Sequence, residues 1–376
     1  MKKILISGGP VFAYLDNVKI ITNRFKGGLM ANLANQIAKM PEKNNIIYLC
    51  SKDSKQPEPS CFIEVIHHNG LYDYRDKVLE LAPKMDAIVL GAAVANLIPL
   101  NKIEGKFPSH NYSPGDIIPI DFTIAPRIID MIKEVNPKVH LFGFKLLSNV
   151  SYYELIRAAY GVLLESKAVT VFANDTNDLM QKYAVTKERG VHPIHNNEVA
   201  QFILDRMNEK YYKTFTREVV SENEYLSKAE EELETIIKEH KNSFIKVEEG
   251  YVFGSAALKF GVDLNECWSF VTTARGKNEI NDFSFVDTVD HNKKEVHCMT
   301  TKKATLNAPL FHNLFRTFSN IHHILHFHHQ RDDLITEKYA TPGTYEDSQR
   351  EKIKPSFNIK GHGCILSFNK KGELLK

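Results

Sequence analysis

Residues 126–147 read PRIIDMIKEVNPKVHLFGFKLL and contain one helical pattern followed by one strand pattern. From Arg127 to Val135, apolar residues recur at the spacing of a helix. From Val139 to Phe144, the chain is a short and mainly apolar run, as in a buried strand. Helices that alternate with apolar strands build α/β proteins, so this stretch predicts an α/β fold.

The same alternation extends outward through residues 1–208. A second helical pattern covers Leu29 to Lys39, and four more apolar runs are candidate strands: Lys3–Ile6, Asn45–Leu49, Ala87–Leu90 and Val169–Ala173. Such strands predict a Rossmann-like parallel sheet with helices on both faces. Sheets of this kind bind ligands at the carboxyl ends of their strands, where glycines and polar residues fall in this chain.

A second unit follows a break in this pattern between about Glu209 and Glu224. Leu226 to His240 reads as a charged amphipathic helix, and three stretches look like strands: Trp268–Thr273, Asp282–Asp290 and Ile321–His329. This mixture predicts an α/β or α+β fold. With a boundary near residue 215, we expect one domain at residues 1–212 and another at 222–376.

Composition excludes several classes of protein. The 48 Lys and Arg against 46 Asp and Glu leave a net charge of +2, which argues against a nucleic-acid partner. No apolar run is long enough to span a bilayer, so we expect no membrane association. The apolar run in Met1–Ile6 is too short for a signal peptide, and the five cysteines form no CxxC pair. A cytoplasmic location is the expectation.

Two glycine-bearing loops suggest phosphate chemistry in the first half. Ser7-Gly8-Gly9 follows the first strand, where glycines let backbone N–H groups approach a phosphate closely. A polar loop from Asp16 to Gly28 then leads into the helix at Leu29, and a helix N-terminus attracts anions. A plain strand-to-helix turn and a helix N-cap with solvated charges are the structural alternatives.

Seven motifs in order resemble the phosphopantothenoylcysteine synthetase (phosphopantothenate–cysteine ligase) family, particularly its stand-alone bacterial form. The motifs are Ile6-Ser7-Gly8-Gly9, Asp16-Asn17-Val18-Lys19 to Thr22-Asn23, Gly91-Ala92-Ala93-Val94-Ala95, Lys102-Ile103, Ala125-Pro126-Arg127-Ile128-Ile129, Gly143-Phe144-Lys145-Leu146-Leu147 and Ala173-Asn174-Asp175. The resemblance covers about the first 208 residues, and residues 126–147 are its closest part.

This resemblance implies a ligase that activates the carboxylate of 4′-phosphopantothenate with CTP or ATP and Mg²⁺, and then joins it to cysteine. Asn23 matches the asparagine that holds the acyl-nucleotide, and Lys102 matches the lysine over the triphosphate. The expected nucleotide contacts are Gly8, Gly9, Ala93, Asn96, Ala125, Pro126, Arg127, Ile128, Phe144 and Lys145. The family shares its active sites across a dimer, which implies a homodimer or a larger homo-oligomer.

The chain departs from the family at four places. The loop after Asn23 reads Arg24-Phe25-Lys26-Gly27 in place of small residues, and Pro10 replaces a threonine. Asn96 stands where the family has an aspartate. Val162 and Ser166 stand where the family often has lysines for the triphosphate, so the choice between CTP and ATP stays open.

Five of the sixteen histidines lie between His322 and His329. On a strand, His326 and His328 project to one face, and two imidazoles at that spacing can chelate a divalent ion. His362, between Gly361 and Gly363, is the candidate third ligand. Ordinary core or surface histidines are the alternative reading.

Residues from about 225 to 376 resemble the class II aldolase/adducin fold. Phe311-His312, His326-Phe327-His328 and Gly361-His362-Gly363 match its motifs, and the resemblance implies Zn²⁺ or another divalent transition metal. Ala308 stands at about the position of the family's catalytic glutamate. The alternatives to the ligase are therefore a metal-dependent lyase, epimerase or dehydratase of a small phosphorylated carbonyl compound, or a degenerate, non-catalytic scaffold.

Overall fold

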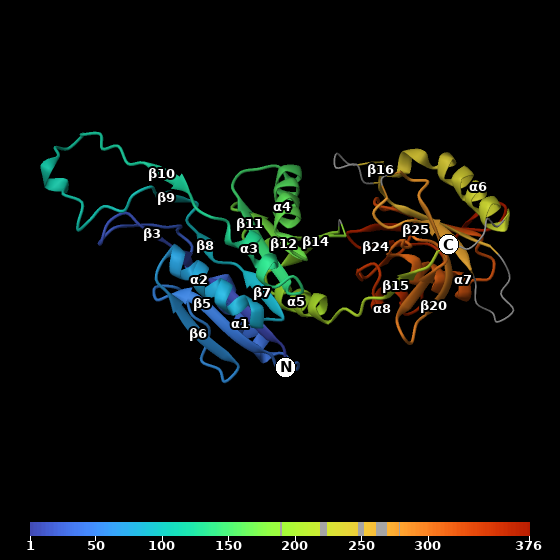
Figure 1. Cartoon of the computed structure of the whole chain (residues 1–376), viewed down its shortest axis with the longest axis horizontal. Coiled ribbons are helices and arrows are strands. Elements are labelled where there is room, and N and C mark those ends of the chain that lie inside the picture. The colour runs from blue at the N-terminus through green and yellow to red at the C-terminus, as the bar shows by residue number, and fades with distance from the viewer. Residues whose placement is uncertain (189, 219–223, 247–251, 261–268, 278) are drawn as a thin grey trace. The chain divides into compact units, whose positions relative to one another are not determined.

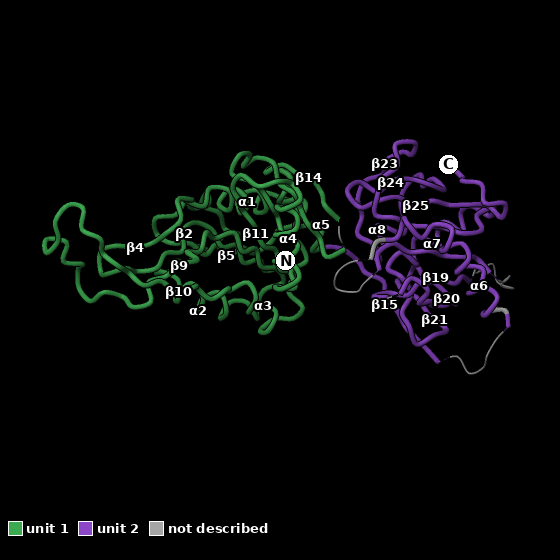
Figure 2. Tube along the Cα trace, turned by 90° about the horizontal axis from the view of Figure 1, so that it is seen from above, with its two compact units in different colours: residues 1–207 green, residues 208–376 purple. Residues whose placement is uncertain are grey.

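The computed structural model describes residues 1–188, 190–218, 224–246, 252–260, 269–277 and 279–376. The chain divides into unit 1, Met1–Met207, and unit 2, Asn208–Lys376 (Figure 2). Trp268, the predicted start of a strand, and Cys267 lie outside the described residues. The other four cysteines are free thiols. None of the described helices combines the length and the apolar character needed to cross a membrane.

Unit 1 is built on an eight-stranded sheet with the order β14-β13-β12-β11-β7-β1-β5-β6. Its strands are β1 (Lys3–Gly8), β5 (Asn45–Ser51), β6 (Ile63–His68), β7 (Ala87–Leu90), β11 (His140–Leu147), β12 (Thr170–Asp175), β13 (Gln181–Thr186) and β14 (Val191–His195). The strands from β6 to β12 are parallel, which confirms the five predicted strands and their parallel pairing. Their order is that of a Rossmann fold.

Helices cover both faces of this sheet, as predicted. One face packs against α1 (Gly28–Lys39) and α5 (Val199–Asn208), and Ile4 and Ile6 of β1 point into that layer. Leu5 points to the opposite layer, which is formed by α2 (Leu71–Leu81), α3 (Ile128–Val135) and α4 (Tyr152–Ser166). The 3-10 helix η1 (Ala82–Lys84) follows α2.

The strands β13 and β14 are antiparallel and were not predicted. Polar residues such as Lys182 and His192 interrupt their apolar character, although both side chains are buried. Lys182 lies inside because its stem packs in the sheet while Nζ donates to the carbonyl of Leu179 at 3.1 Å. Apolar-run patterns therefore miss this edge of the sheet.

Short strand pairs extend unit 1 beyond the carboxyl ends of β1 and β7. They are β2 (Pro10–Val11) with β8 (Ala93–Val94), β3 (Ala13–Tyr14) with β4 (Ile20–Ile21), and β9 (Leu97–Pro99) with β10 (Phe122–Ile124). Residues 97–124, here called the arm, form a long loop that includes η2 (Ser109–Asn111) and reaches away from the sheet (Figure 1). The buried carboxylate of Asp16 ties the β3–β4 hairpin to the arm, because it accepts hydrogen bonds from the backbone N–H groups of Val18, Lys19 and Phe107.

Unit 2 is built on a mostly antiparallel, ten-stranded sheet, which favours the α+β alternative. The order is β15-β21-β20-β19-β18-β22-β25-β24-β23, with β26 on β25. The strands are β15 (Lys213–Thr216), β18 (Ser255–Lys259), β19 (Phe270–Thr273), β20 (Phe283–Asp290), β21 (Glu295–Cys298), β22 (His323–Phe327), β23 (Thr336–Glu337), β24 (Phe357–Ile359), β25 (Gly363–Phe368) and β26 (Leu374–Leu375). The predicted strands around residues 282–290 and 321–329 are confirmed as β20 and β22.

Helices also lie on both faces of the second sheet. The predicted amphipathic helix is α6 (Glu224–Glu239), and it packs against one face through Ala229, Leu233 and Ile237. The other face packs against α7 (Ala308–Thr317) through Phe311 and Phe315. The remaining elements are α8 (Tyr345–Ser348), η3 (Lys241–Ser243), β16 (Ile245–Lys246) and β17 (Val252–Phe253).

The segment after Met207 belongs structurally to unit 2. The backbone N–H of Tyr212 donates to the carbonyl of Gly343 at 2.9 Å, and its side chain is buried in the core of unit 2. The next residues form β15, which pairs in parallel with β21. In the structure, unit 1 ends at Met207 and unit 2 begins at Asn208. This division lies a few residues before the domain boundary expected from the sequence.

Candidate functional site

Two glycine turns meet at the carboxyl ends of β1 and β7 in unit 1. The strand order reverses between these two neighbouring strands, which is where sheets of this type bind ligands. Gly8 ends β1 and Gly9 follows it, and Gly91 follows β7. Close packing requires the glycines: a Cβ on Gly91 would lie 2.1 Å from Sδ of Met30, and one on Gly8 would lie 2.7 Å from Cβ of Met30.

Gly27 brings the second loop to the same place. It is the N-cap residue of α1 and has a φ of 83°. A Cβ on Gly27 would lie 2.3 Å from the backbone nitrogen of Gly9. The start of α1, with its unpaired N–H groups, therefore lies directly against the turn after β1.

Asn23 lies over the segment that follows β7. Its Nδ2 donates to the carbonyl of Val94 in β8 at 2.9 Å. The structure therefore brings Asn23 together with the predicted residues Ala93, Gly9 and Gly8, since β8 pairs with β2 immediately after the glycine turn. The Asn23 side chain keeps its oxygen available to solvent and ligand because the residue is exposed.

Lys102 lies against the β3–β4 hairpin. Its Nζ is 5.3 Å from the centroid of the Tyr14 ring, and the N–H of Ile103 donates to the carbonyl of Leu15 at 2.9 Å. Tyr14 is paired with Ile20 of β4, and Asn23 lies shortly after the end of that strand. The same hairpin thus links the two predicted catalytic residues.

The predicted nucleotide contacts divide into two groups. The N–H of Ala125 donates to the carbonyl of Asn96 at 2.8 Å, which joins the segment of Pro126 and Ile128 to the link between β8 and β9. Arg127 is the N-cap residue of α3, and its guanidinium pairs with Asp130 and Glu165. Two carboxylates therefore already neutralise this cation.

Phe144 and Lys145 belong to β11, which pairs with β7, the strand that precedes Gly91. The ring of Phe144 packs against Phe172 with centroids 5.0 Å apart. Both residues are half-buried near the carboxyl end of the strand. Among the described residues no hydrogen bond joins them to Asn23 or Lys102, so their role in nucleotide binding stays a prediction.

Sequence reasoning missed the loop at residues 51–55. Its Ser54 lies against Gly9, where a Cβ would be 1.9 Å from the Ser54 hydroxyl oxygen. The N–H of Lys55 donates to the carbonyl of Lys26 at 2.8 Å. These contacts connect the turn at Gly9 with the loop that ends at Gly27, and no sequence motif indicates them.

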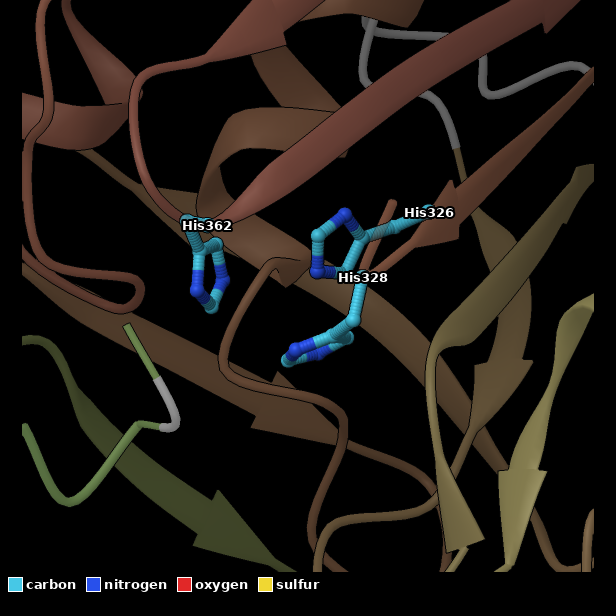
Figure 3. Close-up of side chains that lie close together, drawn as sticks. All are labelled: His326, His328 and His362. Atoms are coloured by element: carbon cyan, nitrogen blue, oxygen red, sulfur yellow. The ribbon is translucent and has the colours of Figure 1, made fainter. Parts of the chain in front are cut away.

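The second candidate site is a cluster of three histidines in unit 2 (Figure 3). One ring nitrogen from each of His326, His328 and His362 lies within 4.8 Å of the others. His326 belongs to β22, His328 follows that strand, and His362 lies in the turn between β24 and β25. The structure thus brings together all three predicted metal ligands.

The imidazole of His326 is oriented for coordination. Its Nδ1 lies 3.0 Å from the carbonyl of Cys364, which can accept a hydrogen bond only if Nδ1 carries the proton. Its Nε2 is buried and has no hydrogen-bond partner among the described residues. Burial lowers the pKa of His326 to about 4, so the ring is neutral at pH 7 and its Nε2 lone pair can bind a metal.

A glycine fixes the approach of the turn to the strand. Gly363 has a φ of 140°, and a Cβ there would lie 1.9 Å from the carbonyl oxygen of Phe327. Any side chain at this position would push the turn away from His328. Cys364 is buried, and among the described residues the cluster of potential ligands consists of the three histidines.

No carboxylate stands at position 308, where the aldolase resemblance places a catalytic glutamate. Ala308 is fully buried at the start of α7. Next to it, Nδ2 of Asn307 donates to the hydroxyl of Ser255 at 3.0 Å, and Ser255 pairs with His326 across β18 and β22. The buried amine of Lys277 donates to the carbonyl of Gly254 at 2.7 Å.

Comparisons with known proteins distinguish the two units. The chain is 28% identical over 173 residues to "Coenzyme A biosynthesis bifunctional protein CoaBC" of Thermococcus kodakarensis, covering 46% of this chain and 41% of that protein. The matched stretch is therefore about two fifths of the length of this relative. The crystal structure of the DNA/pantothenate metabolism flavoprotein from Streptococcus pneumoniae aligns with a TM-score of 0.49 and 22% identity, covering 55% of this chain and 98% of that chain.

For unit 2, L-fuculose 1-phosphate aldolase aligns with a TM-score of only 0.26 and 12% identity, covering 39% of this chain and 76% of that chain. This similarity is too low to carry an argument about fold or function. The aldolase-like expectation therefore continues to depend on the sequence motifs and the three histidines.

The family assignment comes from the first unit. The family model described as "DNA/pantothenate metabolism flavoprotein C-terminal domain" matches residues 1–212, which is more than half of the 376 residues. The match covers the glycine turns, the β3–β4 hairpin and the arm. The chain therefore belongs to the family of the DNA/pantothenate metabolism flavoprotein C-terminal domain.

Proposed function

We propose that unit 1 is a nucleotide-dependent ligase that joins 4′-phosphopantothenate to cysteine, a step of coenzyme A biosynthesis. The hydrogen bond from Asn23 to the carbonyl of Val94 supports this most directly, because it fixes an amide beside the glycine turns. Membership in the family and the name of the Thermococcus relative give independent support.

The proposed reaction has two steps. A carboxylate oxygen of phosphopantothenate attacks the α-phosphorus of the nucleotide, and pyrophosphate leaves. The cysteine amine then attacks the acyl carbon and gives up one N–H proton, and the nucleoside monophosphate leaves with the electron pair of the broken C–O bond. The first step needs cations and N–H groups at the phosphates, and the second needs a fixed donor at the acyl group.

The residues of unit 1 suit these roles. The turn at Gly9 lies against Gly27 at the start of α1, and the proposed phosphate donors are the N–H groups of these two segments. Lys102 supplies an ammonium group, and Mg²⁺ accompanies the triphosphate of CTP or ATP. Arg24 and Lys26 add two cations to the loop after Asn23, where the family has small residues.

Exposed apolar side chains on the arm are evidence in favour of a homodimer or larger homo-oligomer. Several large apolar side chains are exposed on it and on the neighbouring hairpin, among them Ile117 (93% exposed), Ile124 (72%) and Val18 (65%). A concentration of exposed apolar groups on an extended segment is typical of an interface. A second copy of the chain is the proposed partner, in addition to the small-molecule substrates.

Pyrophosphate release with phosphopantothenate, cysteine and either CTP or ATP tests the ligase. We expect cysteine-dependent product from the wild type. Asn23→Ala should reduce amide formation by about 10²–10³-fold, the usual effect of removing one fixed donor. The control is Asn292→Ala, since Asn292 is an exposed asparagine of unit 2. No cysteine-dependent turnover with either nucleotide would contradict the proposal.

A second activity is proposed for unit 2. The three-histidine cluster would hold Zn²⁺ or another divalent transition metal through His326, His328 and His362, and the metal would polarise a carbonyl oxygen. The observation in favour is the buried Nε2 of His326, which has no partner among the described residues. The reaction class would be that of a metal-dependent lyase, epimerase or dehydratase.

Metal analysis of the purified chain tests this second proposal. We expect about one metal ion per chain, lost in the His326→Ala/His328→Ala double variant. His322→Ala is the matched control, because His322 lies in the same histidine-rich segment and interacts with Glu232. If the chain binds neither metal nor nucleotide in a thermal-shift screen, the non-catalytic scaffold becomes the better reading.

A further inference from the structure

Lys277 has a buried amine that neither proposed activity uses. The residue is only 7% exposed, and its Nζ donates to the carbonyl of Gly254 at 2.7 Å. Among the described residues no carboxylate forms an ion pair with it. Asp282, the acid that affects it electrostatically, is instead paired with Lys302 at 2.5 Å.

An ammonium group without a carboxylate partner is unfavourable inside a protein. Burial accordingly lowers the pKa of Lys277 to about 8. Near neutral pH, the unprotonated fraction of this amine is therefore larger than that of a surface lysine. An unprotonated amine is a nucleophile.

The amine lies among other polar groups of the three-histidine site. Gly254 precedes Ser255, which pairs with His326 across the sheet. Asn307 donates to the Ser255 hydroxyl, while its own Oδ1 is buried and has no hydrogen-bond partner among the described residues. The charge of Lys277 also contributes to the lowered pKa of His326, so the two side chains lie within electrostatic range.

We propose that Lys277 forms an imine with a small 2-oxo acid. The ammonium gives up one proton, and the nitrogen attacks the carbonyl carbon. A further proton moves from nitrogen to the carbonyl oxygen, and the first proton returns to that oxygen. Loss of water then breaks the C–O bond, so that one ammonium and one carbonyl give one protonated imine and one water molecule.

The charge of the product identifies the substrate class. A protonated imine keeps the positive charge in a buried place where the described residues offer no carboxylate as a partner. A carboxylate on the substrate, next to the reacting carbonyl, supplies the missing counter-charge. A 2-oxo acid therefore fits better than a neutral aldehyde or ketone.

Reductive trapping tests this inference on the full chain. The protein is incubated with pyruvate and sodium borohydride, and the modified lysine is located by peptide mass spectrometry. Methyl pyruvate is the neutral probe. Lys182 is an internal control, because it is also buried without an ion pair among the described residues and has a pKa lowered to about 8 by burial. It belongs to β13 of unit 1, whereas the histidine cluster belongs to unit 2.

We expect pyruvate to label Lys277 in preference to Lys182, with less labelling by methyl pyruvate. The adduct should disappear in Lys277→Met and in Lys277→Arg, the second of which keeps the positive charge. Absence of an adduct on Lys277 in the wild type, or equal labelling of Lys182, would overturn the inference. Running the reaction after EDTA treatment and again with Zn²⁺ separates this result from the metal proposal, which metal analysis tests independently.

Discussion

The contact between Gly27 and Gly9 can be tested by the substitution Gly27→Ala. Gly27 has a φ of 83°, and an added Cβ would lie 2.3 Å from the nitrogen and 2.7 Å from the Cα of Gly9. Both neighbours are backbone atoms, so the contact is relieved only if one turn moves. The substitution therefore separates the start of α1 from the turn after β1.

The size of the effect follows from two contributions. A non-glycine residue in the left-handed region costs about 1–2 kcal/mol, and overpacking costs about 1–3 kcal/mol, which together give roughly 2–5 kcal/mol. At about 2–4 °C per kcal/mol for a unit of this size, the Tm should fall by roughly 4–20 °C. A displacement of about 1 Å at the proposed site should lower kcat/KM for pyrophosphate release by about 100-fold.

Gly28→Ala is the matched control. Gly28 is the first residue of α1, and a Cβ there would meet only the flexible side chain of Lys55, at 3.4 Å from Cδ. The free energy of unfolding of the Gly28→Ala variant should stay within about 0.5 kcal/mol of the wild-type value. Urea unfolding and pyrophosphate release are measured for both variants. If Gly27→Ala and Gly28→Ala behave alike in both assays, the reasoning about the glycine contact is wrong.

Three further predictions concern stability and assembly. Hydrogen bonds from the N–H groups of Lys19 and Phe107 hold the pKa of Asp16 well below its usual range. The charged carboxylate therefore stabilises the fold at neutral pH, and this contribution fades as the pH falls below the usual range. In urea unfolding, the difference in free energy of unfolding between wild type and Asp16→Asn should therefore shrink in acid. Arg206→Ala leaves the buried Glu188 without the guanidinium that now lies 3.1 Å away and should cost about 3–5 kcal/mol in urea unfolding, with recovery in a variant that also carries Glu188→Gln. The double variant Ile117→Asp/Ile124→Asp should shift the mass measured by light scattering from dimer to monomer, and an unchanged mass would exclude the arm as the interface.

The sequence predicted the parts of the fold that local patterns determine. The runs at β1, β5, β7, β11 and β12 are apolar because these strands are covered on both faces, so their positions could be read directly. The arm could not be predicted, because it is held by the carboxylate of Asp16 and backbone N–H groups from distant segments.

The candidate sites were predictable to a similar extent. Histidine spacing identified His326 and His328, and the flanking glycines identified His362, which the structure brings to the same place. The amine of Lys277 and the amide of Asn307 were missed because their burial depends on the pairing of strands that are distant in the sequence. Nothing in the letters around either residue indicates that burial.

The strand β15 has a practical consequence for anyone who divides this chain. It covers the open edge of β21, whose N–H and C=O groups would otherwise be available to any extended peptide. A fragment that starts after Thr216 would expose that edge and tend to aggregate, even though every other strand of its sheet is retained. A fragment made to study the second unit should therefore begin at or before Asn208, and excess self-association of a shorter fragment would be an artefact of the cut.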